Sequence, residues 1–159
     1  MINLHRSAEA AVRKATERGL TVATAESLTA GMIAAVLADN PGASAMLKGG
    51  VVAYQNSVKA DVLGVPMDLL AEKGSVDGQV AAAMASGART ACGADIGVSA
   101  TGVAGPSAHD GQPVGTVYIG IATAQGASVS SHEFSGSRAE IRAQACSAAL
   151  DRLLEALSS

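Results

Sequence analysis

The spacing of hydrophobic and polar residues along the chain predicts alternating helices and strands. In the first segment, small or apolar residues recur at helical spacing among charged ones: Leu4, Ala8, Ala11 and Ala15. Gly19 follows them and predicts the end of this helix. Five further helical segments are predicted at 29–37, 56–64, 66–74, 76–93 and 138–157. Asp77 is expected to cap the helix of residues 76–93.

Runs rich in Val, Ile, Ala and Thr predict five strands, at 20–25, 49–54, 94–100, 114–124 and 127–134. The last two are expected to form a hairpin through Gln125 and Gly126. Strands separated by helices and followed by a hairpin indicate a mixed sheet layered with helices. We therefore expect a single α/β domain over residues 1–159.

The composition limits the classes of partner. With 48% hydrophobic and 16% charged residues, the 159-residue chain can build a core from small aliphatic side chains. A formal charge of −3 provides no basic surface, which argues against nucleic acids and anionic membranes as partners. The apolar runs are too short to span a bilayer, and the first segment lacks the apolar core of a secretory signal, so a cytoplasmic location is expected.

The two cysteines, Cys92 and Cys146, lie far apart and outside any cluster of metal ligands. Free cysteines of this kind most often behave as small hydrophobic residues. We expect both to contribute to packing, and the sequence predicts no metal site and no cofactor.

Polar residues occur at the expected carboxyl ends of three strands, where ligands bind in sheets of this kind. The first group, Glu26-Ser27-Leu28-Thr29, lies between a strand and a helix. A serine there would face unpaired backbone amides and the positive end of the helix dipole, and both stabilise an oxyanion. The simpler alternative is that Ser27 or Thr29 is only the N-cap of the helix. The residues around Ser27 match neither the G-x-S-x-G nor the S-x-x-K nucleophile motif.

The second group is "YQNSVK", in which Tyr54 ends a strand and Lys59 lies in the first turn of a helix. The helix dipole repels a cation there, and no carboxylate lies three or four residues away. Partial burial would lower the pKa of the lysine further, as a general base near neutral pH requires. Tyr54 could relay the proton or hold the lysine. The alternative is an ordinary surface lysine.

The third group is the Gly- and Pro-rich loop from Thr101 to Pro113. Gly102 and Gly105 allow backbone amides to close around an anion, and Thr101 offers a hydroxyl. The alternative is a simple connection. A triad of Ser27 with His109 and Asp110 is possible, but an isolated histidine in a loop is more often exposed to solvent.

Arg138 and Arg142 lie one turn apart on the last helix and have no carboxylate three or four residues away on that helix. Like charges at this spacing repel each other. A carboxylate from elsewhere in the fold could pair with them, and so could a phosphate.

Five blocks of the sequence occur in the order and spacing of one family: "TAESLTAG", "GGVVAYQNSVKADVLGV", "VSATGVAGP", "PVGTVYIG" and "FSGSRAEIRAQA". On these blocks the chain resembles the CinA C-terminal domain family, the nicotinamide-nucleotide amidohydrolases, from about Val22 to Ala148. The resemblance implies a three-layer α/β/α sandwich. It also implies deamidation of nicotinamide mononucleotide to nicotinate mononucleotide with release of ammonia, a step of pyridine nucleotide salvage.

The resemblance also implies a set of site residues. Ser27 would be the nucleophile, supported by Lys59 and Tyr54. The residues implied or expected to bind the substrate are Glu26, Thr29, Ala30, Gly31, Thr101, Gly102, Ala104, Gly105 and Arg142. Ala30 departs from the usual pattern, because the family commonly has Thr-Gly-Gly where this chain has Thr29-Ala30-Gly31.

The residues and the resemblance lead to one mechanism. Neutral Lys59 would take the proton of Ser27, and amides near Ala30 and Gly31 would hold the oxyanion. The alternative is a catalytically silent nucleotide-binding or regulatory module, related to competence or damage. The expected partner is a small pyridine nucleotide. The small, weakly charged side chains also lead us to expect a homo-oligomer.

Overall fold

The computed structural model describes the backbone of residues 2–159 and the side chains of residues 4–159, and Met1 of the expected domain lies outside the described residues. One mixed sheet has the strand order β2-β1-β3-β4-β5. Its strands are β1 (Val22–Glu26), β2 (Leu47–Val52), β3 (Ile96–Gly102), β4 (Thr116–Thr123) and β5 (Gly126–Glu133). β1 pairs in parallel with β2 and β3, whereas β4 and β5 continue the sheet in antiparallel pairs. The predicted mixed sheet and final hairpin are confirmed.

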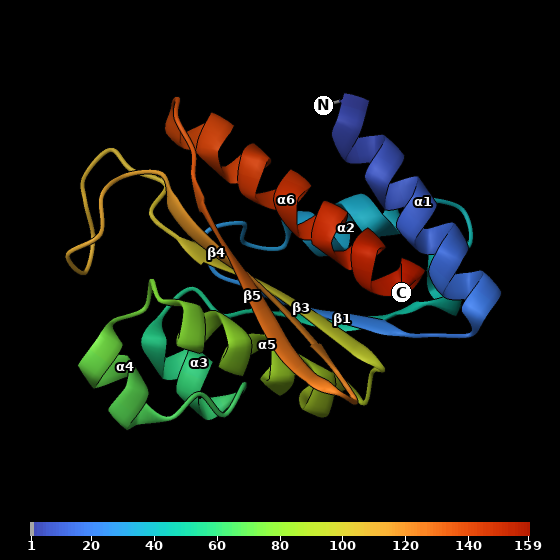
Figure 1. Ribbon diagram of the computed structural model, residues 1–159, viewed down its shortest axis with the longest axis horizontal. Coiled ribbons are helices and arrows are strands. Elements are labelled where there is room, and N and C mark those ends of the chain that lie inside the picture. The colour runs from blue at the N-terminus through green and yellow to red at the C-terminus, as the bar shows by residue number, and fades with distance from the viewer. Residues whose placement is uncertain (1) are drawn as a thin grey trace.

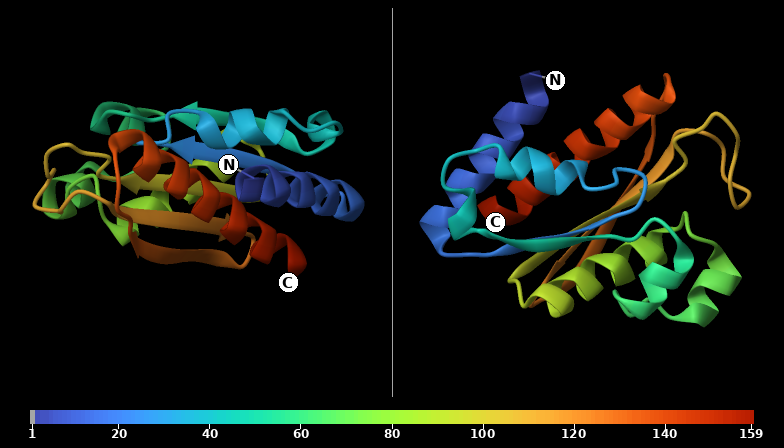
Figure 2. Two further views of the ribbon diagram at one scale, coloured as in Figure 1. Left: turned by 90° about the horizontal axis from the view of Figure 1, so that it is seen from above. Right: turned by 180° about the vertical axis from the view of Figure 1, so that it is seen from behind.

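Helices cover both faces of this sheet (Figure 1). The first helical layer contains α1 (Ile2–Arg18), α2 (Met32–Ala38) and α6 (Arg138–Ser158). The second contains α3 (Asn56–Asp61), α4 (Met67–Lys73) and α5 (Gly78–Cys92), and a short 3-10 turn, η1 (Ala43–Ala45), precedes β2. Figure 2 shows the sheet between these layers from two further directions. The fold is therefore the three-layer α/β/α sandwich. No helix in residues 2–159 has the length and hydrophobicity of a membrane span.

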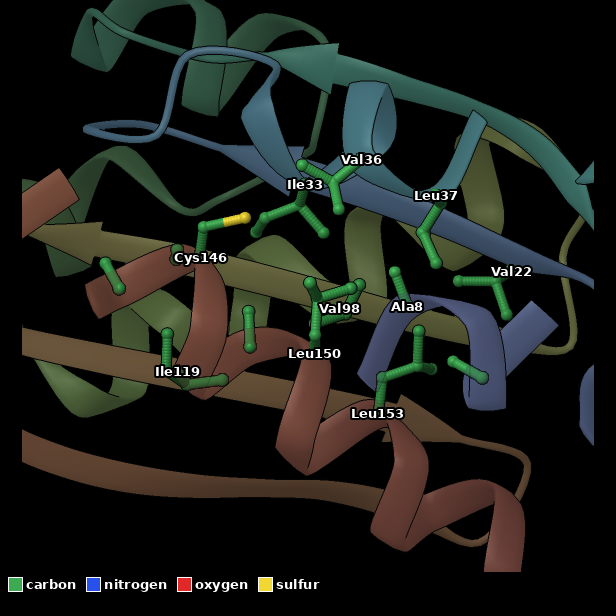
Figure 3. Packing of buried hydrophobic residues seen from close by; sticks show 14 of the residues in the cluster. Ala8, Val22, Ile33, Val36, Leu37, Val98, Ile119, Cys146, Leu150 and Leu153 are labelled. Atoms are coloured by element: carbon green, nitrogen blue, oxygen red, sulfur yellow. The ribbon is translucent and has the colours of Figure 1, made fainter. Parts of the chain in front are cut away.

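The larger core lies between the sheet and the first helical layer (Figure 3). Val98 of β3 and Ile119 of β4 face Leu150 and Leu153 of α6, and all four are fully buried. Cys146 lies in the same core, and burial raises the pKa of its thiol to about 12. Its expected role as a small hydrophobic residue is thus confirmed.

The second layer lies unusually close to the sheet because small residues line the contact. A Cβ atom on Gly97 of β3 would lie 2.0 Å from the carbonyl oxygen of Ala85 in α5, and one on Gly120 of β4 would lie 2.5 Å from that of Ala81. Larger side chains would push α5 away. The Asp77 carboxylate accepts hydrogen bonds from two amides at the start of α5, which confirms the predicted cap.

The main departure from the predicted elements is the segment that follows β1. β1 includes Glu26, and α2 begins at Met32 rather than at Thr29. Ala30 (φ 49°) and Gly31 (φ 98°) adopt left-handed backbone conformations, which a right-handed helix cannot contain. Residues 27–31 therefore form a tight loop between β1 and α2.

Candidate active site

Three connections leave the carboxyl ends of neighbouring parallel strands and meet at one edge of the sheet. Ser27 follows β1, Lys59 lies in α3 after β2, and the loop of residues 103–115 follows β3. In Figure 1 this yellow loop projects from the same end of the sheet as α3. The topology thus places the three polar groups predicted from the sequence at one site.

Ser27 is held rigidly at this edge. Its backbone amide donates to the carbonyl oxygen of Ala100 in β3 at 2.9 Å, which extends the pairing of the two strands by one residue. Ser27 is only 9% exposed. Most of its surface is therefore shielded from bulk water.

The Lys59 side chain is fully buried, with 0% exposed, and its amine contacts three oxygen atoms. Nζ donates to Oγ of Ser27 at 3.1 Å, to the carbonyl oxygen of Ala53 at 2.8 Å and to that of Tyr54 at 3.2 Å. The predicted pairing of serine with lysine is present in the structure. An ordinary surface lysine, the alternative for this residue, is excluded.

Burial lowers the pKa of Lys59 from 10.5 to about 8, and the negative charge of Asp110 opposes part of this shift. The sequence interpretation attributed the shift first to the helix dipole. α3 has only six residues, so Lys59 lies in its last turn as well as near its start. Loss of hydration is therefore the main cause, and the burial is complete rather than partial.

The α2 N-terminus is occupied by Glu26, which lies beneath the loop rather than in the pocket. Its two carboxylate oxygens accept from the amides of Ile33 at 2.8 Å and Ala34 at 3.0 Å. Neither Ser27 nor Thr29 caps α2, so the alternative that they are only caps is wrong. Glu26 also neutralises the helix end that was expected to stabilise an oxyanion.

The loop itself provides the remaining amides. The amide of Ala30, expected at the oxyanion, already donates to the carbonyl oxygen of Ser27 at 3.0 Å. Within the described part of the chain, the amides of Leu28, Thr29 and Gly31 have no hydrogen-bond acceptor. Of these three residues only Leu28, which directly follows the candidate nucleophile, lines the cavity beside Ser27, so its amide is the better candidate for an oxyanion site.

A cavity of about 300 Å³ opens beside Ser27. Six of the expected residues line it: Ser27, Tyr54, Thr101, Gly102, Ala104 and Gly105. The Thr101 hydroxyl, however, donates to the carbonyl oxygen of Ser75 at 2.6 Å, so its role is to join two walls of the cavity. The expected substrate-binding residues that do not line the cavity are Glu26, Thr29, Ala30, Gly31 and Arg142.

Arg138 lines this cavity, and the sequence interpretation left its role open. Its guanidinium donates to the hydroxyl of Tyr54 at 2.8 Å and to the carbonyl oxygen of Gly105. Tyr54 is 53% exposed, and its hydroxyl contacts Arg138 rather than Lys59. Tyr54 thus holds the lysine through its backbone carbonyl, and the geometry does not favour a proton relay through its side chain. The sequence feature that points to a role for Arg138 is the absence of a carboxylate three or four residues away on α6.

Arg142 supports the loop of residues 27–31 from behind. Its Nε donates to the carbonyl oxygen of Leu28 at 2.7 Å, and Nη2 donates to that of Thr29 at 3.3 Å. The arginine expected to bind substrate therefore acts, in this structure, on the conformation of the candidate oxyanion loop.

Arg142→Ala should weaken catalysis through this loop rather than through substrate binding. Losing two charge-assisted hydrogen bonds to carbonyl groups should lower kcat about 10-fold. KM should change little, and the loss should be equal for a nucleotide substrate and its dephosphorylated form. Steady-state kinetics with both substrates checks this. A rise in KM confined to the phosphorylated substrate would return Arg142 to the binding role first expected.

A larger cavity of about 780 Å³ lies at the opposite end of the sheet, beside Arg89 and Arg152. It is far from the carboxyl ends of the parallel strands and contains no hydroxyl paired with a buried amine. The smaller cavity beside Ser27 is therefore the better candidate for catalysis.

Comparisons with known proteins agree with this fold. The sequence model of the protein family described as "CinA C-terminal domain" matches residues 4–157 of this chain. The chain is 48% identical over 145 residues to a CinA-like protein of Geobacter sulfurreducens, covering 91% of this chain and 35% of the relative. It is 47% identical over 135 residues to a CinA-like protein of Frankia casuarinae, covering 85% of this chain and 31% of the relative. The chain thus spans about a third of the length of these curated relatives.

Two crystal structures show the same architecture over the whole chain. The competence/damage inducible protein CihA from Agrobacterium tumefaciens has a TM-score of 0.94 and 35% identity, covering 99% of this chain and 96% of that one. A CinA superfamily protein from Klebsiella pneumoniae has a TM-score of 0.93 and 32% identity, covering 98% of both chains. Both support the arrangement described above.

Proposed function

Because the chain belongs to the CinA C-terminal domain family, we propose that it is a serine amidohydrolase that converts nicotinamide mononucleotide to nicotinate mononucleotide and ammonia. One observation carries the proposal: Nζ of the fully buried Lys59 lies 3.1 Å from Oγ of Ser27, at the wall of a small cavity. A buried amine with a lowered pKa is suited to activate a serine hydroxyl. The cavity volume suits a small molecule.

The hydrogen bonds around Lys59 define the orientation of its neutral form. A neutral amine has two N–H groups and one lone pair. The carbonyl oxygens of Ala53 and Tyr54 accept the two N–H groups, which leaves the lone pair directed at the hydroxyl of Ser27. The amine takes the hydroxyl proton as Oγ forms a bond to the carboxamide carbon. The C=O electron pair moves to oxygen, where the free amide of Leu28 can donate to it.

The second half of the reaction returns the proton. As the C–N bond breaks, the Lys59 ammonium protonates the leaving nitrogen, which departs as ammonia. The acyl group remains as an ester on Ser27. A water molecule, deprotonated by Lys59, then attacks the ester carbon. The resulting tetrahedral intermediate collapses as the Lys59 ammonium protonates Oγ, which restores the hydroxyl of Ser27 and releases the acid product.

Arg138 is the residue best placed to recognise the 5′-phosphate. It lines the same cavity as Ser27 and residues 102–105, and no carboxylate within residues 4–159 forms an ion pair with it. A guanidinium in this setting can donate two parallel hydrogen bonds to a phosphate.

Arg138→Ala should therefore raise KM for the mononucleotide about 10-fold or more, the scale of a charge-assisted hydrogen bond. KM for the dephosphorylated riboside should barely change, because it lacks the phosphate. Arg138→Lys keeps the charge but not the planar geometry. Its KM for the mononucleotide should lie between the values for the wild type and for Arg138→Ala. Equal effects on mononucleotide and riboside would rule out phosphate recognition by Arg138.

The proposal also includes the remaining expectations from the sequence: a cytoplasmic location, a homo-oligomeric state and pyridine nucleotides as the ligands. The test of the function is ammonia release from nicotinamide mononucleotide by the purified protein. Turnover with a matching yield of nicotinate mononucleotide supports the enzyme. Nucleotide binding without ammonia release would instead support the alternative, a silent binding or regulatory module.

A further inference from the structure

The loop between β3 and β4 contains a tight turn at residues 109–112. His109 and Gln112 exchange both backbone hydrogen bonds, with N···O distances of 3.1 and 2.9 Å. The two central residues, Asp110 (φ 49°) and Gly111 (φ 76°), are both left-handed. This is the type I′ turn that the Asp-Gly sequence favours. The turn therefore fixes the direction in which the Asp110 side chain leaves the loop.

The Asp110 carboxylate joins this turn to the segment between α4 and α5. Its Oδ2 accepts from the amide of Ser75 at 2.9 Å and from the hydroxyl of Ser75 at 2.7 Å. Gly74 lies so close that a Cβ atom there would be 3.0 Å from Cβ of Asp110. The carbonyl oxygen of Ser75 in turn accepts from the hydroxyl of Thr101, near the end of β3. These contacts form one connected network at the wall of the cavity.

We propose that Asp110 is a positioning residue that latches residues 103–114 against Ser75 over the active-site cavity: its carboxylate holds this loop in place through the two hydrogen bonds from Ser75. The inference rests on the function proposed above. The latch is the contact between Asp110 and Ser75. Ser75, on one side of this contact, and His109, next to Asp110 on the other, both line the cavity. Because the hydroxyl and amide of Ser75 both bind the same carboxylate oxygen, breaking the contact would loosen the tip of the loop that forms much of the cavity wall.

The charged and titratable groups near the latch are few. His109 Nε2 lies 3.4 Å from Oδ2 of Asp110 on the same loop, and Lys59 of α3 contributes a positive charge. The hydrogen bonds from Ser75 lower the pKa of Asp110 below its ordinary value of 3.8. The carboxylate is thus ionised at neutral pH, and the latch is lost only as the pH falls through that lowered value. In return, the Asp110 charge raises the pKa of Lys59 against the effect of burial.

Two substitutions separate the charge from the hydrogen bonds. Asp110→Asn keeps the left-handed turn, which asparagine tolerates, and keeps an oxygen that can accept from Ser75. It removes the charge, so the pKa of Lys59 should fall below its wild-type value of about 8, and the acidic limb of kcat should move to lower pH with it. Ser75→Ala keeps the charge and removes one hydrogen bond. KM should then rise several-fold with the acidic limb unmoved, and amide exchange in residues 103–114 should accelerate.

Asp61→Asn is the matched control, because it removes an exposed carboxylate from the helix that carries Lys59. It should move neither the acidic limb nor KM. NMR titration of the Lys59 Cε signal and hydrogen exchange of residues 103–114 test the inference without any substrate. Failure of the wild-type protein to release ammonia would overturn the proposed function but not these two measurements. Unchanged loop exchange in Ser75→Ala would overturn the latch, and an unchanged Lys59 titration in Asp110→Asn would overturn the effect of the Asp110 charge on Lys59.

Discussion

Ser27→Ala should reduce ammonia release from nicotinamide mononucleotide by a factor of ~10³ or more and leave the fold and nucleotide binding intact. Ser27 Oγ is the only hydroxyl oxygen within residues 4–159 that contacts the Lys59 amine. Its removal eliminates the nucleophile, while Lys59 keeps its bonds to the carbonyl oxygens of Ala53 and Tyr54. Steady-state ammonia release, nucleotide titration and thermal unfolding measure the three properties.

Ser57→Ala is a suitable control for this substitution. Ser57 is exposed on α3, two residues from Lys59, and its loss removes a hydroxyl of the same kind without touching the cavity. Its turnover should equal that of the wild type. Turnover in Ser27→Ala within about 10-fold of the wild type would mean that Ser27 is not the nucleophile.

Lys59→Met should be as inactive as Ser27→Ala, yet more stable than the wild type at pH 7. Burial of the ammonium lowers the pKa of Lys59 in the folded state to about 8, so below that pH folding bears the full cost of burying the charge. That cost is on the order of 3 kcal/mol, and the loss of the lysine's hydrogen bonds offsets part of it. We expect a net gain of about 1–2 kcal/mol.

The pH dependence of this gain follows from the direction of the shift. Between pH 8 and 10.5 the unfolded chain binds the Lys59 proton more tightly than the folded protein, so wild-type stability rises with pH across that window. The advantage of Lys59→Met should therefore be largest below pH 8 and disappear above 10.5. Chemical denaturation at several pH values measures it, with Lys48→Met, an exposed lysine in β2, as the control.

The same lysine should set the acidic limb of the wild-type pH–rate profile, because only its neutral form accepts the Ser27 proton. Activity should rise with pH up to about 8, the lowered pKa of Lys59. Lys59→Arg should be nearly inactive, since a guanidinium stays protonated at this pH. An active arginine variant, or a stability difference that does not depend on pH, would contradict the role of Lys59 as a buried general base.

The position of the site could be predicted from the sequence because it depends on topology. Parallel strands present their carboxyl ends at one edge of a sheet, so polar residues after successive strands must approach one another there. Ser27 and Lys59 are separated by 32 positions, and their places after two neighbouring strands, together with the family resemblance, are sufficient to predict that they pair. The periodic spacing of hydrophobic residues in the strands and helices was sufficient to predict the layers of the fold.

Side-chain partners within the site could not be predicted in this way. Arg138 and Arg142 lie on one face of α6, and sequence spacing cannot tell which of them reaches the cavity. The structure places Arg138 in the cavity and turns Arg142 to the loop behind Ser27. Glu26 was expected to bind substrate because of its position, but the left-handed backbone of residues 30 and 31 brings the helix amides onto its carboxylate. Such partners depend on loop geometry that no periodic pattern encodes.

One measurement tests the central claim most directly: incubation of the purified protein with nicotinamide mononucleotide in heavy-oxygen water, followed by mass spectrometry of the nucleotide and an ammonia assay. If the buried lysine activates Ser27 for amide hydrolysis, the product is nicotinate mononucleotide that carries heavy oxygen in its new carboxylate. Ammonia then forms in equal amount, and the Ser27→Ala variant forms neither. Recovery of the unchanged nucleotide from a protein that binds it would contradict the account.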